Sequence, residues 1–397
     1  MANTTGKSFF DGAFGRYVLP GVIVQSVLIG GGYATGREIV EYGAKYGALG
    51  WLGGIAIFIG FTIVAMLTFE IARMNRAYDY RSLIKQFAGK LWIAFDLIYL
   101  ALAILVIAVM ASATGEIVQQ TLGLNYWVGV VGITVLVGIL NFYGEKLIER
   151  FETYGTIALF IGYMIFSWIV ISNTWGQAQQ VFATKDTSFM SEGITVGAIM
   201  WSGLIYVGYN LIAFPPALFT IKRQKKRKEA IWAGVIAGLL MTIPFMLTYF
   251  ALMGHYPSKD VLGSTVPWLA MLQGQGAWVV ILFGIVVGWT LIETATGVIH
   301  AFIDRVNTGL KELGKPRLSR KQNAFIAIIA LAGSVALAKI GIIDLIAKGY
   351  TFMAYGMIAV YLLPLLTIGV IRIVNPEWKR EFWNTGKKNM EEEAFKH

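Results

Sequence analysis

Apolar residues gather along this chain of 397 residues into long runs, which short polar connections separate. Many runs reach the roughly 18–20 residues that a helix needs to cross a bilayer. A β-barrel would instead show alternating segments of about ten residues. The pattern therefore predicts an all-α polytopic membrane protein with ten transmembrane helices. The predicted spans are 14–43, 48–72, 91–121, 125–143, 152–172, 193–221, 229–254, 276–303, 323–340 and 345–374.

Positive charge is divided unevenly between the connections. The even-numbered connections and both tails hold 27 of the 33 Lys and Arg residues, and the run KRQKKRK lies at 222–228. Because Lys and Arg are retained on the cytoplasmic side, this asymmetry predicts an even number of spans and two cytoplasmic termini. The N-terminus lacks the basic start and the short apolar core of a cleaved signal peptide. We therefore expect the first span to direct the protein to a bacterial-type cytoplasmic membrane.

Composition agrees with this topology. Charged residues make up 14% of the chain and hydrophobic residues 56%, whereas soluble domains carry about a quarter charged residues. The net charge of +10 is explained by the retained Lys and Arg, so we expect no nucleic-acid partner. The chain has no cysteine, which excludes disulfides and thiol chemistry, and we expect no cofactor.

Two predicted spans carry helix-breaking residues at mid-depth. The first contains GGGYATG at 30–36, and the sixth contains SGLIYVGYNLIAFPP at 202–216. Irregular backbone survives in a membrane only where it lines a cavity or is buried in protein. Matching interruptions in two halves are typical of transporters built from inverted repeats. The alternative is that these glycines only let helices pack closely.

The positions of the interruptions suggest how the chain is organised. They fall in the first helix of each five-helix half, and the pair Gly32-Tyr33 recurs as Gly208-Tyr209. We expect one transmembrane domain over 1–397. It comprises a repeat at 14–172, an inverted repeat at 193–374 and a cytoplasmic tail at 375–397.

These features resemble those of a known group of membrane proteins. Ten spans with interruptions in the first and sixth are similar to the LeuT-type fold of the amino acid-polyamine-organocation (APC) superfamily. The stretches GGGYATGRE and YVGYN resemble the YkvI-like amino acid permease family. This resemblance implies alternating access, in which spans 1, 2, 6 and 7 rock against spans 3, 4, 8 and 9. It also implies a substrate site between the two interruptions, with spans 3 and 8 as walls.

A helix broken at mid-membrane exposes free N–H groups on one side of the break and free C=O groups on the other. These groups suit the carboxylate and the ammonium of a zwitterionic amino acid. The predicted substrate-binding residues are Gly30, Gly31, Gly32, Tyr33, Ala34, Met110, Thr114, Tyr206, Gly208, Tyr209, Asn210, Trp289 and Thr290.

Glu293 is the acidic residue near the middle of the eighth span, and an ionisable group there is costly. Thr290 and Thr294 share its helical face, and the resemblance implies a sodium site in this region. Glu293 could bind Na⁺ directly, or it could exchange a proton, because burial disfavours its charged form. The face continues to His300 and Asp304, which could extend an ion route. The alternatives are a structural hydrogen bond for Glu293 and simple exposure of the other two to water.

Arg37 follows the first interruption, and the resemblance implies an extracellular gate between such an arginine and an acid on the tenth span. Asp344 is the candidate partner. The alternative is a local partner for Arg37, either Glu38 or Glu41.

These observations predict a secondary active transporter for an amino acid or similar small organic solute, coupled to H⁺ or Na⁺. A channel or sensor of the same fold is the alternative. An enzyme is disfavoured because neither HExxH nor GxSxG occurs, and a nucleotide-driven pump because no GxxxxGK[ST] loop occurs. We expect the solute and the bilayer as partners and a monomer or homodimer as the assembly.

Overall fold

A computed structural model describes residues 12–377, apart from 144, 191, 193 and 313. Over these residues the regular elements are all helical. The α-helices are α1 Leu19–Leu28, α2 Gly31–Thr35, α3 Arg37–Tyr42, α4 Trp51–Asn75, α5 Tyr80–Ala88, α6 Trp92–Leu122, α7 Tyr126–Tyr143, α8 Glu145–Thr184, α9 Val196–Tyr209, α10 Arg227–Met253, α11 Lys259–Leu262, α12 Pro267–Leu272, α13 Ala277–Glu312, α14 Arg320–Ala338, α15 Ile342–Asp344, α16 Thr351–Met357 and α17 Val370–Val374.

Tighter and wider helical turns occur between these elements. The 3₁₀ segments are η3 Ala44–Leu49, η4 Gly89–Leu91, η5 Asn210–Ala213 and η6 Pro215–Arg223. The π-helical segments are η2 Phe14–Val18, η7 Leu345–Tyr350, η8 Ile358–Leu362 and η9 Leu365–Gly369. Three of the four π-helical segments lie in the last predicted span, so that span is wound unevenly.

Among the described residues, seven helical segments are long and apolar enough to cross a membrane. They correspond to seven of the predicted spans, and shorter apolar helices at Phe14–Leu28 and Tyr126–Leu140 correspond to the first and fourth. The predicted fifth span lies within α8. The chain is therefore a helical membrane protein, as predicted, and the total of ten spans stays a prediction.

Several predicted connections are partly helical. α8 continues to Thr184, beyond the predicted end at 172, because the polar continuation SNTWGQAQQVFAT still contains good helix formers such as Gln and Ala. α5 lies in the connection after the second span, and α11 and α12 lie in the connection before the eighth. The connections thus supply short helices that cover the ends of the bundle.

The first predicted span is interrupted twice. α1 ends at Leu28, Ile29 leaves helical geometry with ψ 69°, and Gly30 is extended. Gly36 then takes a left-handed conformation, with φ 84°, and separates α2 from α3. A side chain would disfavour that conformation, so glycine is the residue suited to it. The predicted interruption is confirmed, and it cuts the span into three pieces.

The sixth predicted span changes its winding rather than unwinding. α9 ends at Tyr209, and the chain continues as the 3₁₀ segments η5 and η6. Pro215 and Pro216 open the second of these segments, where a proline lacks the N–H group and clashes with the preceding turn of an α-helix. A 3₁₀ stretch inside a helix often marks a hinge, so this interruption is confirmed as well.

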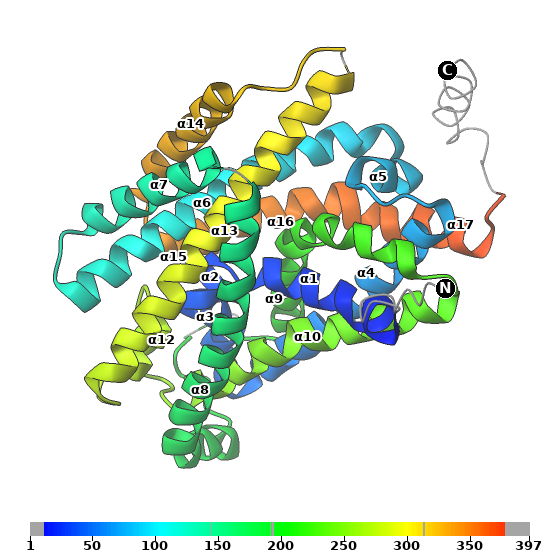
Figure 1. Ribbon diagram of the computed structural model, residues 1–397. Coiled ribbons are helices and arrows are strands. Elements are labelled where there is room, and N and C mark those ends of the chain that lie inside the picture. The colour runs from blue at the N-terminus through cyan, green and yellow to red at the C-terminus, as the bar shows by residue number, and fades with distance from the viewer. Residues whose placement is uncertain (1–11, 144, 191, 193, 313, 378–397) are drawn as a thin grey trace, which may run out of the picture.

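The two interrupted spans lie against each other in the middle of the bundle (Figure 1). α1 packs against η6 and α10, while α3 packs against α9 and η7. α2 packs against α6, α12 and α13. The third and eighth predicted spans are therefore the walls beside the first interruption.

Glycines bring α4 and α10 together. Gly234 and Gly238 are four residues apart on α10, and a methyl group added at Gly234 would lie 2.6 Å from the backbone nitrogen of Met66. A methyl group at Gly238 would collide with the Thr62 hydroxyl. Small residues at this spacing let two membrane helices approach closely, and α4 and α10 pack tightly along this face.

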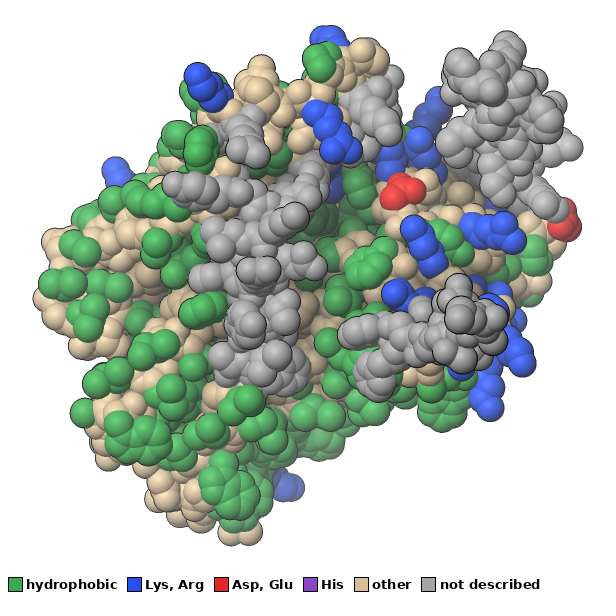
Figure 2. Space-filling view, in the orientation of Figure 1, with side chains coloured by type: hydrophobic (Ala, Val, Ile, Leu, Met, Phe, Trp, Pro, Cys, Tyr) green, Lys and Arg blue, Asp and Glu red, His purple; other side chains and the backbone are tan. Residues whose placement is uncertain are grey.

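The surface reflects the two environments of the chain. Figure 2 shows Lys and Arg side chains at the top of the molecule, around the connection between α13 and α14, and on its right, around α5 and the beginning of α10. Large apolar side chains stay exposed along α4, α7, α10 and α13. Apolar surface on this scale suits lipid rather than water.

Candidate functional site

The first interruption contacts both predicted walls. A methyl group added at Gly30 would lie 2.8 Å from Cγ2 and 3.0 Å from Oγ1 of Thr294, and 3.2 Å from Cε of Met110. Thr294 lies on α13 and Met110 on α6. The structure thus brings together three residues that were predicted from separate spans. There is no space for a side chain at Gly30 unless a wall moves.

Glu38 turns toward the interruption. Its side chain is buried, and a methyl group added at Gly32 would lie 2.6 Å from its Oε1 atom. The same methyl group would lie 2.6 Å from Cδ1 of Ile346, on the tenth predicted span. The carboxyl group therefore occupies the space beside the Gly-rich backbone, where we expected a solute's carboxylate.

Tyr209 joins the second interruption to the first. Its hydroxyl group donates a hydrogen bond of 2.5 Å to Oε2 of Glu38. Tyr209 is the last residue of α9, and Glu38 is the second residue of α3. This one bond therefore connects the C-terminal part of the first interrupted span to the end of the α-helical part of the other.

Tyrosine rings surround this bond. The ring of Tyr209 lies 4.6 Å from that of Tyr350, 5.5 Å from that of Tyr42 and 5.5 Å from that of Tyr206, between centroids. The hydroxyl group of Tyr42 in turn donates to the carbonyl oxygen of Ile346 at 3.1 Å. The cluster gives α3, α9 and η7 a shared aromatic core, and aromatic pairs at such distances attract each other.

A short helix covers the first interruption. Trp268 of α12 is buried, and a methyl group added at Gly36 would lie 3.0 Å from its Cδ1 atom. Its ring meets that of Tyr163 edge to face at 5.5 Å, and the Tyr163 hydroxyl donates to the carbonyl oxygen of Tyr33 at 2.9 Å. α8 and α12 thus hold the backbone of α2 in place.

Arg37 and Asp344 are not paired in this structure. Nη1 of Arg37 donates to the carbonyl oxygens of Leu262, at 2.6 Å, and Ser264, at 3.3 Å. Its Nη2 lies 3.6 Å from Oε2 of Glu41. Asp344 instead pairs with Lys348 at 2.8 Å, and its side chain is 49% exposed. Arg37 therefore fastens α3 to the connection between α11 and α12, and its acidic partner is the local one, Glu41.

The face of α13 that was predicted to bind an ion lies only partly within the described side chains. Thr290 is buried and its hydroxyl donates to the carbonyl oxygen of Val286 at 3.0 Å. Glu293 is partly buried, one position before the Thr294 that meets Gly30. The side chains of His300 and Asp304 lie outside the described residues.

The other predicted binding residues serve mainly to hold the helices. A methyl group added at Gly208 would lie 3.0 Å from Cγ1 of Ile358, so this glycine packs against the tenth span. Nδ2 of Asn210 donates to the carbonyl oxygen of Tyr206 at 2.9 Å. The Thr114 hydroxyl donates within its own helix, to Met110, at 2.9 Å. Trp289 is partly buried, Ala34 is fully buried, and the surroundings of Gly31 lie outside the described residues.

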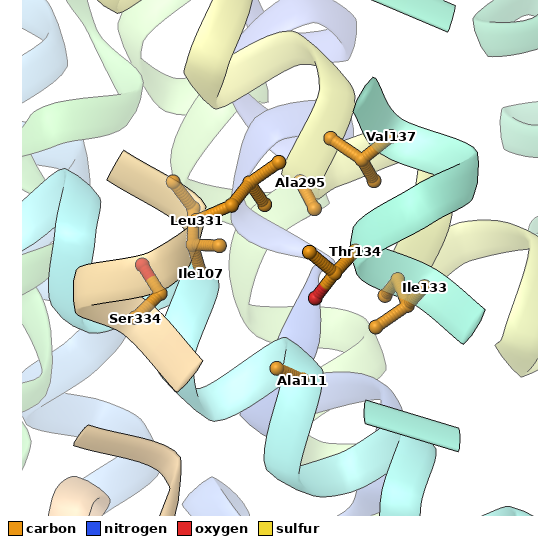
Figure 3. Close-up of a pocket in the computed structure, with 8 residues that line it drawn as sticks. All are labelled: Ile107, Ala111, Ile133, Thr134, Val137, Ala295, Leu331 and Ser334. Carbon is orange, nitrogen blue, oxygen red and sulfur yellow. The ribbon is translucent and has the colours of Figure 1, made fainter. Parts of the chain in front are cut away.

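Two hollows lie away from the bond between Glu38 and Tyr209. The one in Figure 3 lies between α6, α7, α13 and α14, and its Thr134 and Ser334 hydroxyls donate to carbonyl groups of their own helices. Apolar side chains complete its lining, namely Ile107, Ala111, Ile133, Val137, Ala295 and Leu331. The other hollow lies between α1, α8 and α10 and includes Gln25, Ile29 and Tyr163. Neither includes a charged side chain.

The sequence reasoning missed Glu38 and Trp268 as members of the site. Glu38 and Arg37 are neighbours in a helix, so their side chains diverge by about 100°, and only one of them can face the connection between α11 and α12. That geometry indicates that one of the two turns inward, but it does not show which one. Trp268 follows Pro267 at the start of an apolar stretch, and proline at the first position is a signal for a helix.

Comparison with known proteins supports the fold. No family model matches the chain. The chain is 23% identical over 353 residues to "Uncharacterized membrane protein YkvI" of Bacillus subtilis (strain 168), covering 85% of this chain and 92% of that one. It is similar in structure to a Na⁺-coupled sialic acid symporter in a substrate-bound outward-open state, with TM-score 0.60 and 14% identity over 89% of this chain and 79% of the other.

A second structural neighbour is the manganese transporter of Eremococcus coleocola, in a mutant form. The TM-score is 0.55 and the identity 14%, over 95% of this chain and 85% of that one. These likenesses place the chain in the LeuT-type fold, as predicted.

Proposed function

We propose that the chain is a secondary active transporter that carries an amino acid or similar small organic solute by alternating access. The observation that carries this proposal is the meeting of both interrupted spans at one place. Gly30 contacts Thr294 and Met110 of the two walls, and Tyr209 reaches Glu38 from the second interruption. Discontinuous helices that meet in this way form the solute sites of many transporters. We do not propose an enzymatic activity.

The coupling ion is H⁺ or Na⁺. Thr290, Glu293 and Thr294 carry oxygen atoms on α13, and Thr294 lies beside the first interruption. Hard cations such as Na⁺ prefer oxygen ligands. The sodium-coupled neighbour supports the same possibility for this fold. His300 and Asp304 remain candidates for a continuation of that route along the same helix.

A carrier of divalent metal ions, suggested by the manganese transporter, fits less well. The first interruption has one acid and one methionine beside it, Glu38 and Met110. The second offers Tyr209 and Asn210, and the amide of Asn210 is engaged by its own helix. Among the described residues no group of three or more His, Cys, Asp and Glu side chains gathers.

We also propose that both termini face the cytoplasm of a bacterial-type cell, in its inner membrane. The Lys and Arg residues that gather around α5 and the beginning of α10 support this orientation. Because the chain has no cysteine, single-cysteine variants give a clean test. An impermeant thiol reagent should label Asp260→Cys on intact cells and Lys226→Cys only after lysis.

A thermal-stability screen of the purified protein against amino acids and related solutes, with and without Na⁺, tests the proposed binding. A ligand at 100 times its dissociation constant stabilises the folded state by about 2.7 kcal/mol. We expect a raised melting temperature with a small set of chemically related solutes. Equal melting temperatures across a broad set of solutes would contradict a specific solute site.

A further inference from the structure

Glu38 is a buried acid on the outer part of the first interrupted span. It is 4% exposed, and it lies two residues after Gly36, where the left-handed backbone separates α2 from α3. A buried carboxylate is stable only when a positive charge or a set of hydrogen bonds compensates for its lost hydration. The groups around Glu38 therefore determine whether its carboxyl group is stable in the charged form.

No cationic side chain among the described residues pairs with Glu38. The adjacent Arg37 is directed to Leu262, Ser264 and Glu41, and Lys45 pairs with Glu41 at 2.6 Å. Six tyrosines from the surrounding elements interact electrostatically with Glu38. They are Tyr33 of α2, Tyr42 of α3, Tyr163 of α8, Tyr206 and Tyr209 of α9, and Tyr350 of η7.

The Glu38 carboxyl group has close neighbours at both of its oxygen atoms. Oε2 lies 2.5 Å from the Tyr209 hydroxyl, and Oε1 lies where a methyl group on Gly32 would collide with it. Ile346 closes the same space from the tenth span. A proton can join this carboxyl group without displacing these neighbours.

We propose that Glu38 is the group that binds and releases the coupled proton, and that Tyr209 transmits its charge state to the second interrupted span. The inference rests on the proposed transport function and specifies its coupling. A proton from the outside joins a carboxylate oxygen of Glu38 and gives the neutral acid. Its release toward the cytoplasm restores the carboxylate, and Tyr209 keeps its own proton throughout.

The hydrogen bond gives this titration a mechanical consequence. A hydrogen bond to a carboxylate is roughly twice as strong as one between neutral groups. The charged form of Glu38 therefore holds α3 to α9, and the neutral form loosens the connection between the two interrupted spans. Proton binding and the movement of these helices are then parts of one equilibrium, which is the requirement for coupled transport.

Infrared difference spectroscopy of the purified protein, between neutral and alkaline pH, tests the inference without any solute, because exposed carboxyl groups stay ionised over that range. We expect a protonated-carboxyl C=O band in the wild type that is lost in Glu38→Gln. The band should persist in Glu41→Gln, three residues along the same helix, and in Glu293→Gln. An unchanged band in a folded Glu38→Gln protein, or its loss in Glu293→Gln, would overturn the inference.

Two further variants keep the test informative. Glu38→Asp retains a carboxyl group, so its band should be present at a changed frequency even if Glu38→Gln folds poorly. Tyr209→Phe should also change the frequency, because the carbonyl loses its hydrogen bond. Absence of any band in a folded Glu38→Asp protein would contradict a titrating acid at this position.

The outcomes for the two proposals are separable. If the Glu38 band is present and no solute is taken up by proteoliposomes, the transport function fails and the proton site stands. If Glu38→Gln still accumulates a solute under a proton gradient alone, the proton site fails and the transport function stands.

Discussion

The hydroxyl group of Tyr209 lies 2.5 Å from Oε2 of Glu38, and this hydrogen bond links the two interrupted spans at the centre of the bundle. Both residues are buried. Each lies next to a change in backbone geometry, at Gly36 on one side and at Asn210 on the other. The bond is therefore placed where a small movement of either span would break it.

The Tyr209→Phe variant removes this bond and leaves the ring in place. A hydrogen bond to a charged group contributes about 1.5–3 kcal/mol, so we expect a lower melting temperature than in the wild type when Glu38 is charged. Thermal unfolding of the purified protein measures it. Tyr355→Phe is the matched control, because Tyr355 is 49% exposed on the tenth span. Equal losses in both variants would contradict a special role for Tyr209.

The Gly30→Leu variant tests whether the first interruption is the solute site. A side chain there would meet Thr294 and Met110 at once, so α2 could no longer lie against α6 and α13. We expect the solute-dependent rise in melting temperature to disappear. Gly132→Leu on α7 is the control, since no atom lies within 4 Å of an added methyl group there. Undiminished stabilisation by the solute in Gly30→Leu would place the site elsewhere.

The Arg37→Gln variant should free the outer connection that follows α11. The guanidinium group donates to the carbonyl oxygens of Leu262 and Ser264, whereas its ion pair with Glu41 stays within α3. We expect faster amide hydrogen exchange over residues 259–273, because this connection opens more often. Asp344→Asn should leave that exchange unchanged. Faster exchange in Asp344→Asn would restore the pairing of Arg37 with Asp344 as the gate.

His255, in the connection after α10, gives the protein a pH dependence. Burial lowers the pKa of His255, because desolvation disfavours its charged form. The unfolded chain then binds more protons, so stability is full above the unfolded pKa of about 6.5 and falls as the pH drops through the folded pKa. We expect His255→Gln to flatten the decline of the melting temperature between about pH 7.5 and about pH 5. An equally steep decline in the variant would exclude His255 as its cause.

Much of the fold could be predicted because its determinants are local. Long apolar runs give the spans, and the Gly-rich stretch before Arg37 and the prolines at 215 and 216 give the interruptions. The contact of Gly30 with Thr294 follows from knowing which spans lie beside the break. The spans and the interruptions need only periodicity and the conformational limits of Gly and Pro, whereas the walls beside the break were implied by the family resemblance.

The parts that could not be predicted depend on side chains from distant segments. Glu38 and Tyr209 are 171 residues apart, and nothing local shows which of the neighbours Arg37 and Glu38 turns inward. Asp344 was predicted as the gate from the resemblance, yet Lys348 is one turn away on the same helix and pairs with it. Every residue has a backbone carbonyl group, so the sequence does not show which of them accept hydrogen bonds from Arg37.

The most direct test of transport is uptake by proteoliposomes of a solute that stabilises the purified protein, under an inward proton or sodium gradient. We expect saturable uptake in which the solute inside exceeds the outside concentration, and this accumulation should collapse when an ionophore removes the gradient. Uptake that only equalises the two concentrations and rises linearly with solute, with currents far above carrier turnover, would contradict it and favour a channel.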